Sequence, residues 1–188
     1  MKRLIVGISG ASGVIYGIRL LQVLRQGGEV ETHLVLSAAA KATIAQETDW
    51  KISDVEKLAS VVYHPNDIGA SIASGSFVTM GMVIAPCSIK TLSAVANSYS
   101  ADLMSRAADV CLKEGRPLIL CVRETPLHLG HLRLMTRAAE IGATILPPVP
   151  AFYGRPQTVD DMVDGTVGRL LLRLGIDNEL YTKWKGMK

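Results

Sequence analysis

A glycine-rich turn at residues 7–13, G-I-S-G-A-S-G, is the strongest chemical signal in the sequence. It follows an apolar run at residues 4–8 and precedes a helical pattern at residues 14–25. Glycines let the backbone approach a phosphate, and the N–H groups and dipole of the following helix favour its negative charge. The spacing is G-x-x-G-x-x-G, and the predicted second strand ends in Ser37 instead of the acid that binds a dinucleotide ribose. The pattern favours a mononucleotide such as FMN, with a ligand-free turn as the alternative.

Polar residues also follow a later apolar run at residues 82–85. Ser88 and Thr91 have side chains that cap helix N-termini, and this role alone would explain them. The same hydroxyls, with the free N–H groups of the helix, are also suited to the polar edge of a flavin ring. Capping and flavin binding are compatible, so both interpretations stay open.

Arg123 and Glu124 end another apolar run, at residues 118–122. A charged pair at the end of a buried strand costs free energy unless its charges are satisfied. We expect Arg123 to bind an anionic ligand and Glu124 to transfer protons. The alternative is a structural salt bridge at the edge of the sheet.

Two sets of residues have metal-like spacing. Asp160, Asp161 and Asp164 match D-D-x-x-D, which holds magnesium on a diphosphate in some prenyl-transferring enzymes. Thr158 precedes them, however, so helix capping and compensation of the helix dipole account for the first two acids. His128 and His131 have no third ligand nearby, and we expect surface or capping roles for them. The sequence therefore predicts no metal site.

Short strands and helices alternate along the whole chain. We expect an α/β fold, a three-layer doubly wound parallel sheet of the Rossmann type, formed by one domain over residues 1–188. In such a sheet the residues after the strands meet at one edge. The predicted strands are 4–8, 32–36, 82–85, 118–122 and 143–146, with a weaker one at 61–63, and the predicted helices are 14–25, 38–46, 89–97, 101–114, 129–141 and 159–174.

Composition excludes several classes of function. A net charge of +3 with no basic run argues against nucleic-acid binding. The sequence contains no run of 18 uninterrupted apolar residues, so it predicts no membrane span. Glycines interrupt the apolar N-terminal region, and we therefore expect a cytoplasmic protein. Cys87, Cys111 and Cys121 lack metal-ligand spacing and lie in apolar surroundings, which predicts buried, reduced thiols.

Five separated segments together resemble the UbiX-type flavin prenyltransferases. They are the G-A-S-G turn and residues 83–88, 106–110, 118–126 and 147–157, and the similarity extends over residues 2–175. Within the family the sequence looks like bacterial members that accompany ubiquinone biosynthesis or a phenolic acid decarboxylase. The resemblance implies that dimethylallyl phosphate alkylates reduced FMN at N5 and C6 without a metal, closing a fourth ring. The prenylated FMN would serve a UbiD-type decarboxylase.

The resemblance also implies an assembly and a set of site residues. It implies a homo-oligomer, a dodecamer in relatives, with sites between subunits and with residues 159–188 packing on a neighbouring subunit. Glu124, Glu47 and Ser12 would be catalytic, Glu47 through proton transfer near the flavin. Tyr153 and Arg169 would bind dimethylallyl phosphate, with Lys113, Arg106 and Glu124 around its phosphate, some from neighbouring subunits. The residues implied to contact FMN are Gly10, Ala11, Ser12, Ser37, Ser88, Ile89, Lys90, Thr91 and Arg123.

The sequence departs from the family in one respect. Relatives often have a tryptophan in the segment aligned with residues 64–69, where Ile68 is the nearest candidate here, whereas Trp184 resembles a tryptophan of the family. A related FMN-dependent cysteine decarboxylase is a rival function, but residues 72–81 lack its histidine and its P-x-M-N-x-x-M-W motif is missing. Direct decarboxylation of aromatic acids is a second rival function, and non-catalytic flavin carriage is a third.

Overall fold

One six-stranded sheet, with the strand order β3-β2-β1-β4-β5-β6, organises the protein. The computed structural model describes residues 2–184 and 186. Every neighbouring pair of strands is parallel, so the predicted α/β fold is confirmed. The strands are β1 (Lys2–Ile8), β2 (Val30–Leu36), β3 (Val61–Tyr63), β4 (Met82–Cys87), β5 (Leu118–Val122) and β6 (Thr144–Ile145).

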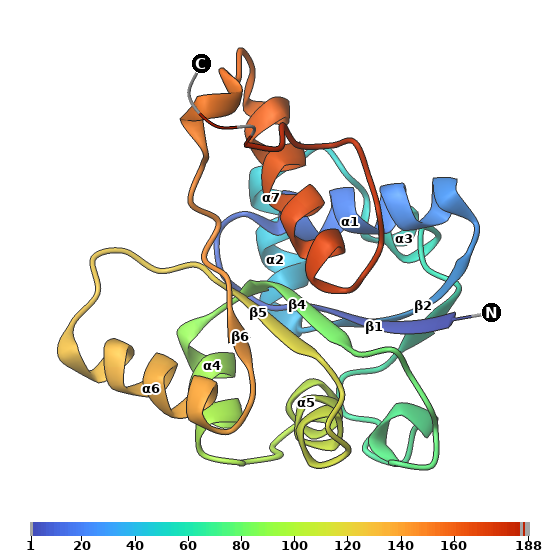
Figure 1. Ribbon diagram of the computed structural model, residues 1–188. Coiled ribbons are helices and arrows are strands. Elements are labelled where there is room, and N and C mark those ends of the chain that lie inside the picture. The colour runs from blue at the N-terminus through green and yellow to red at the C-terminus, as the bar shows by residue number, and fades with distance from the viewer. Residues whose placement is uncertain (1, 185, 187–188) are drawn as a thin grey trace.

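Helices cover both faces of this sheet (Figure 1). On one face α1, α2, α3 and α7 bury a core with residues such as Leu4 and Leu34, and on the other α4, α5 and α6 pack over Ile5 and Val35. Consecutive strand residues point to opposite faces, which explains this division. The helices are α1 (Val14–Gly27), α2 (Ala38–Glu47), α3 (Ile52–Glu56), α4 (Ile89–Ala96), α5 (Leu103–Lys113), α6 (Leu129–Glu140) and α7 (Val159–Arg173).

The register of the strands aligns their carboxyl ends. Ile8, the last residue of β1, pairs with Leu36, the last residue of β2, so Ser9 and Ser37 leave the sheet side by side. Gly7 pairs with Ile84 of β4, whose register with β5 shifts between Ile84 and Cys87. The loops that follow β1, β2, β4 and β5 therefore meet at one edge, as expected for a parallel sheet.

Some boundaries differ from those predicted. β4 continues through Pro86 to Cys87, and α5 begins at Leu103 because Asp102 forms a capping box with Ser105. Helix α3 and two 3-10 helices, η1 (Ser71–Ala73) and η2 (Phe152–Gly154), were not predicted. These segments span one turn or little more, which is too short for hydrophobic periodicity to reveal.

Two further expectations from composition concern membrane spans and thiols. Within residues 2–184 and 186 there is no helix long and apolar enough to cross a membrane. The three cysteines are buried free thiols, as predicted. Burial raises the pKa of the Cys111 thiol to about 11 and that of the Cys121 thiol to about 12. The thiolate is the reactive form, so both thiols are unreactive at neutral pH.

Gly17 sets the distance between α1 and β4. A Cβ atom at this position would lie 2.2 Å from the carbonyl oxygen of Ala85 and 2.7 Å from the Ile8 side chain. We expect Gly17→Ala to lower the free energy of unfolding by about 3 kcal/mol, because overpacking a rigid backbone contact forces the helix away from the sheet. Gly27→Ala is the matched control in the same helix, where no atom lies within 4 Å of the added Cβ. Urea unfolding of both variants checks this, and equal stabilities would contradict it.

Candidate active site

Ser9 joins the glycine-rich turn to the start of α4. Its Oγ donates to the carbonyl oxygen of Pro86 and accepts from the N–H of Ser88, both at 2.8 Å. The Ser9 side chain is buried, and its own N–H also donates to Pro86. Ser9 was not among the predicted site residues. The only signal for it in the sequence is a small hydroxyl directly after an apolar strand.

We expect Ser9→Ala to lower the free energy of unfolding by about 2 kcal/mol, because the N–H of Ser88 loses its acceptor and the carbonyl oxygen of Pro86 loses one of its two donors. Urea unfolding measures this change. Ser100→Ala is the matched control, since Ser100 is exposed. Equal unfolding free energies for the two variants would show that Ser9 does not hold the two loops together.

Two helix N-termini point at the same edge of the sheet. Ser37 caps α2 by accepting from the N–H of Ala40 at 3.0 Å, and its own N–H donates to Ile8 at the turn. Ser88 caps α4 by accepting from the N–H of Thr91 at 3.3 Å. The capping role predicted for Ser88 is therefore confirmed, whereas the one predicted for Thr91 is wrong, because Thr91 lies within α4 and supplies the N–H group that Ser88 accepts. The positive ends of both helix dipoles make this edge favourable for an anion.

The turn itself has room only for glycine at Gly10. A Cβ there would lie 2.3 Å from the Cβ of Ala39, in the first turn of α2. Gly13 has a φ of 94°, and its N–H donates to Glu47 Oε2 at 2.8 Å. The structure therefore brings Glu47, from the end of α2, to the turn. Ser12, between these glycines, is exposed beside them.

Arg123 reaches the same edge from the end of β5. Its N–H donates to the carbonyl oxygen of Cys87. Within residues 2–184 and 186 its guanidinium forms no ion pair, and the Glu124 carboxylate instead accepts from the N–H of Thr125 at 3.0 Å. The alternative of a structural Arg123–Glu124 salt bridge is therefore wrong. Burial raises the pKa of Tyr16, and the nearby Arg123 charge opposes this rise.

Tyr153 and Arg169 share a cavity of about 720 Å³. The Arg169 guanidinium carbon lies 5.8 Å from the ring centroid of Tyr181, and the Tyr153 ring packs edge-on against Trp184 at 5.5 Å. Besides apolar side chains, the lining holds two arginines and three acids, namely Arg155, Arg169, Asp161, Asp164 and Glu179. The apolar part suits a small prenyl group, and the arginines suit the phosphate that it carries. The residues on the wall include Leu146, Pro147, Val149, Pro150, Met162 and Leu180.

The acids of D-D-x-x-D serve the structure. Asp161 and Thr158 form a capping box, and the N–H groups of Gln157 and Thr158 hold the pKa of the Asp161 carboxyl below its usual range. Asp164 pairs with Arg19 of α1 through two bonds of 2.6 and 3.0 Å. The predicted cap is confirmed, and Asp160 lies beside Asp161 in the first turn.

His128 has the predicted capping role. Its Nδ1 accepts from the N–H of Gly130 at 3.0 Å, at the N-terminus of α6. The ring of His131 lies against it, with centroids 3.6 Å apart. Within the described residues no group of three His, Cys, Asp or Glu side chains is arranged to hold a metal ion.

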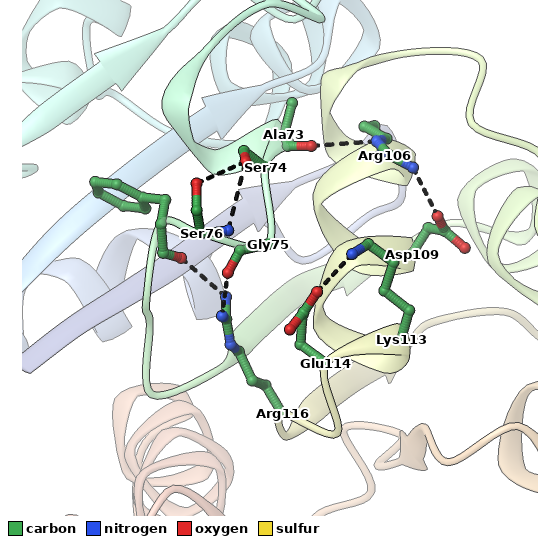
Figure 2. A network of polar contacts seen from close by, with 10 residues as sticks. Ala73, Ser74, Gly75, Ser76, Arg106, Asp109, Lys113, Glu114 and Arg116 are labelled. Atoms are coloured by element: carbon green, nitrogen blue, oxygen red, sulfur yellow. Dashed lines mark hydrogen bonds and ion pairs between the residues drawn. The ribbon is translucent and has the colours of Figure 1, made fainter.

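Arg106 and Lys113 lie on α5 (Figure 2). The chain after Lys113 reaches Pro117, whose carbonyl oxygen accepts from the N–H of Met82 at the start of β4. Lys113 therefore lies near the amino ends of the strands, at the opposite edge of the sheet from the glycine-rich turn.

Of the other predicted residues, Lys90 and Thr91 line a smaller hollow of about 350 Å³ beside α4. Ile89 is partly buried, and Ile68 is 64% exposed.

The carboxyl edge fits the phosphate and the polar ring edge of a flavin. The observation that supports this fit is the turn that only glycine can form at Gly10, placed between two helix N-termini and beside an arginine that pairs with no described carboxylate. The predicted residues that the chain gathers there are Gly10, Ala11, Ser12, Ser37, Glu47, Ser88, Thr91, Arg123 and Glu124.

Comparisons with known proteins identify the family of this chain. The Flavoprotein family model matches residues 1–171. The flavin prenyltransferase UbiX of Escherichia coli (strain K12) is 63% identical, with 99% of this chain and 100% of that relative covered. A crystal structure of AnUbiX (PadA1) in complex with FMN and dimethylallyl pyrophosphate has a TM-score of 0.96 at 46% identity, covering 100% and 99% of the two chains. A dodecameric FMN-dependent UbiX-like decarboxylase from Escherichia coli O157:H7 has a TM-score of 0.96 at 47% identity, covering 98% and 100%.

The alignments with these relatives extend over 99% and 100% of this chain, so they include all the loops described above. The chain belongs to the Flavoprotein family and, within it, to the UbiX-type flavin prenyltransferases.

Proposed function

We propose that this protein transfers the dimethylallyl group of dimethylallyl phosphate to N5 and C6 of reduced FMN, making prenylated FMN. The observation that carries the proposal is the cavity that Arg169 and Tyr153 share with apolar residues such as Leu146, Val149 and Met162. A dimethylallyl phosphate donor needs a cation to bind its phosphate and an apolar surface to bind its five-carbon chain. The solved relative in complex with FMN and dimethylallyl pyrophosphate supports a flavin and a dimethylallyl donor as substrates.

The carboxyl edge would hold FMN as the acceptor substrate. Gly10, Ala11 and Ser12 would offer backbone and hydroxyl groups to its phosphate, with the N-termini of α2 and α4 adding their dipoles. Arg123 would pair with an anionic part of the bound substrates. Reduced flavin supplies the electron-rich ring atoms that are alkylated. The remaining residues assigned to this substrate are Ser37, Ser88, Ile89, Lys90 and Thr91.

The donor is activated by its cationic surroundings. When the bond between the allylic carbon and the phosphate oxygen breaks, negative charge grows on the phosphate, and Arg169 stabilises it without a metal. Tyr153, Lys113 and Arg106 would hold the same phosphate. The position of Lys113 at the opposite edge of its own sheet implies that a neighbouring copy supplies it. Glu124 and Glu47 would move protons, Glu124 assisting removal of the proton from C6.

Because a neighbouring copy would supply Lys113, the proposed site requires an assembly of several copies. We infer a homo-oligomer, and the dodecameric relative supports a dodecamer. In the described part of this chain, Thr182 lies against Gly154 and Tyr181 against Gly168, so the end of the chain packs on its own η2 and α7. Packing of residues 159–188 on a neighbouring subunit stays a prediction. We also propose delivery of the product to a UbiD-type decarboxylase in the cytoplasm.

An FMN-dependent decarboxylase is the second candidate, because one solved relative is described by that activity. A decarboxylase or a flavin carrier has no use for the cavity around Arg169. To distinguish these functions, the protein is incubated anaerobically with reduced FMN and dimethylallyl phosphate, with and without EDTA, and the released phosphate is measured. We expect one phosphate released per flavin at a rate that EDTA leaves unchanged. Carbon dioxide from a cysteine-terminated peptide, without phosphate release, would favour the decarboxylase instead.

A further inference from the structure

A turn segment, residues 73–77, begins at the last residue of η1 and is held against α5 by two arginines (Figure 2). Arg106 Nε donates to the carbonyl oxygen of Ala73 at 3.2 Å. Arg116 donates to the carbonyl oxygens of Gly75 and Phe77, at 2.5 and 2.9 Å. The carbonyl oxygens of Ala73, Gly75 and Phe77 therefore each accept from a guanidinium. Ser74 and Ser76 lie between these three residues in the sequence.

Lys113 lies between these two arginines along the chain. Its Nζ is 2.5 Å from Glu114 Oε1, and this contact holds the pKa of the Glu114 carboxyl below its usual range. A Cβ on Gly75 would lie 2.1 Å from Glu114 Oε1 and 2.9 Å from Lys113 Nζ. The backbone of Gly75 is thus the surface against which the lysine–glutamate pair rests.

The arginines differ in their other partners. Arg106 Nη1 pairs with Asp109 Oδ2 at 2.9 Å, so its charge is partly neutralised on its own helix. Within the described residues Arg116 has no carboxylate partner, and both of its bonds go to the segment. A partly buried charge that makes only backbone contacts is well placed to fix a loop.

We propose that Arg116 is a positioning residue, which clamps residues 73–77 so that Gly75 holds Lys113 and Ala73 holds Arg106 in the geometry that binds the donor phosphate. This rests on the proposed function, in which Lys113 and Arg106 bind that phosphate. Arg116 acts through these cations and does not itself touch the substrate. Loss of the clamp frees Gly75, and the lysine–glutamate pair loses its support.

A double-mutant cycle on the full-length protein tests the assignment. The variants are Arg116→Met, Lys113→Met and the double variant, with steady-state kinetics measured against dimethylallyl phosphate at saturating reduced FMN. We expect Arg116→Met to raise KM about tenfold with kcat changed less, and Lys113→Met to lower kcat/KM about 100-fold. The double variant should be worse than Lys113→Met by less than the tenfold effect of Arg116→Met alone, because residues that act through one another are not additive.

Two further variants keep the test decisive if Arg116→Met fails to fold. Arg116→Lys retains one donor and should restore part of the affinity for the donor substrate, whereas Gly75→Ala should raise KM by displacing Glu114. Arg133→Met, an exposed arginine on α6, is the control. Additive effects in the cycle, or an unchanged KM in Arg116→Met, would overturn the assignment. Wild-type protein that binds FMN without prenyl transfer would refute the proposed function, and this assignment with it.

Discussion

Arg169→Met is expected to lower kcat/KM for dimethylallyl phosphate by about 100- to 1000-fold, the usual cost of removing a charge that stabilises a developing anion. Within the described residues this guanidinium pairs with no carboxylate, and its nearest described partner is the face of Tyr181. Its charge is therefore available to the departing phosphate. FMN affinity should change little, because FMN is assigned to a different set of loops.

Arg173→Met is the matched control for this prediction. Arg173 is exposed one turn further along α7 and does not line the cavity. Both variants remove one positive charge from the same helix, so a general electrostatic effect would appear in both. Similar decreases of kcat/KM in the two variants would contradict the assignment of Arg169 to the donor site.

Gly10→Ala is expected to weaken FMN binding by at least about 100-fold, because the turn must move to relieve the contact with Ala39 and its N–H groups then miss the phosphate. Fluorescence quenching of FMN on titration measures the dissociation constant. The double variant Gly10→Ala with Ala39→Gly removes the opposing methyl group and should restore much of the affinity. If it does not, the loss has another cause than this contact.

Much of the fold could be predicted because its signals are local. Residues 118–122 were predicted with the observed bounds of β5, and Ser88 and Thr158 cap the helices that the sequence assigned to them. Alternating strands and helices leave few arrangements besides a parallel sheet. Each of these features depends on residues only a few positions apart.

The site was harder to predict because its contacts are long-range. Ser9 and Ser88 are 79 residues apart, and nothing near either residue shows that their hydrogen bond forms. The cavity around Arg169 depends on Glu179 and Tyr181 folding back over α7. Arg123 and Glu124 are adjacent in sequence, yet they do not pair, because each finds its contact elsewhere. Tertiary packing decides all three features.

The placement of Arg106 and Lys113 shows the same limit. Their position on α5 follows from the helical pattern, but only the fold shows that Lys113 and the glycine-rich turn lie at opposite edges of the sheet. A site that needs both must draw on more than one copy of the chain. Assembly is thus part of the chemistry of the proposed site.

The mass of the flavin after turnover is the most direct test of prenyl transfer. The purified protein would be incubated anaerobically with reduced FMN and dimethylallyl phosphate, with metal removed, and the flavin extracted and analysed by mass spectrometry. Our account predicts FMN that has gained one C5 prenyl unit. Unmodified FMN recovered from protein that still binds it would contradict the account and favour a carrier or a decarboxylase.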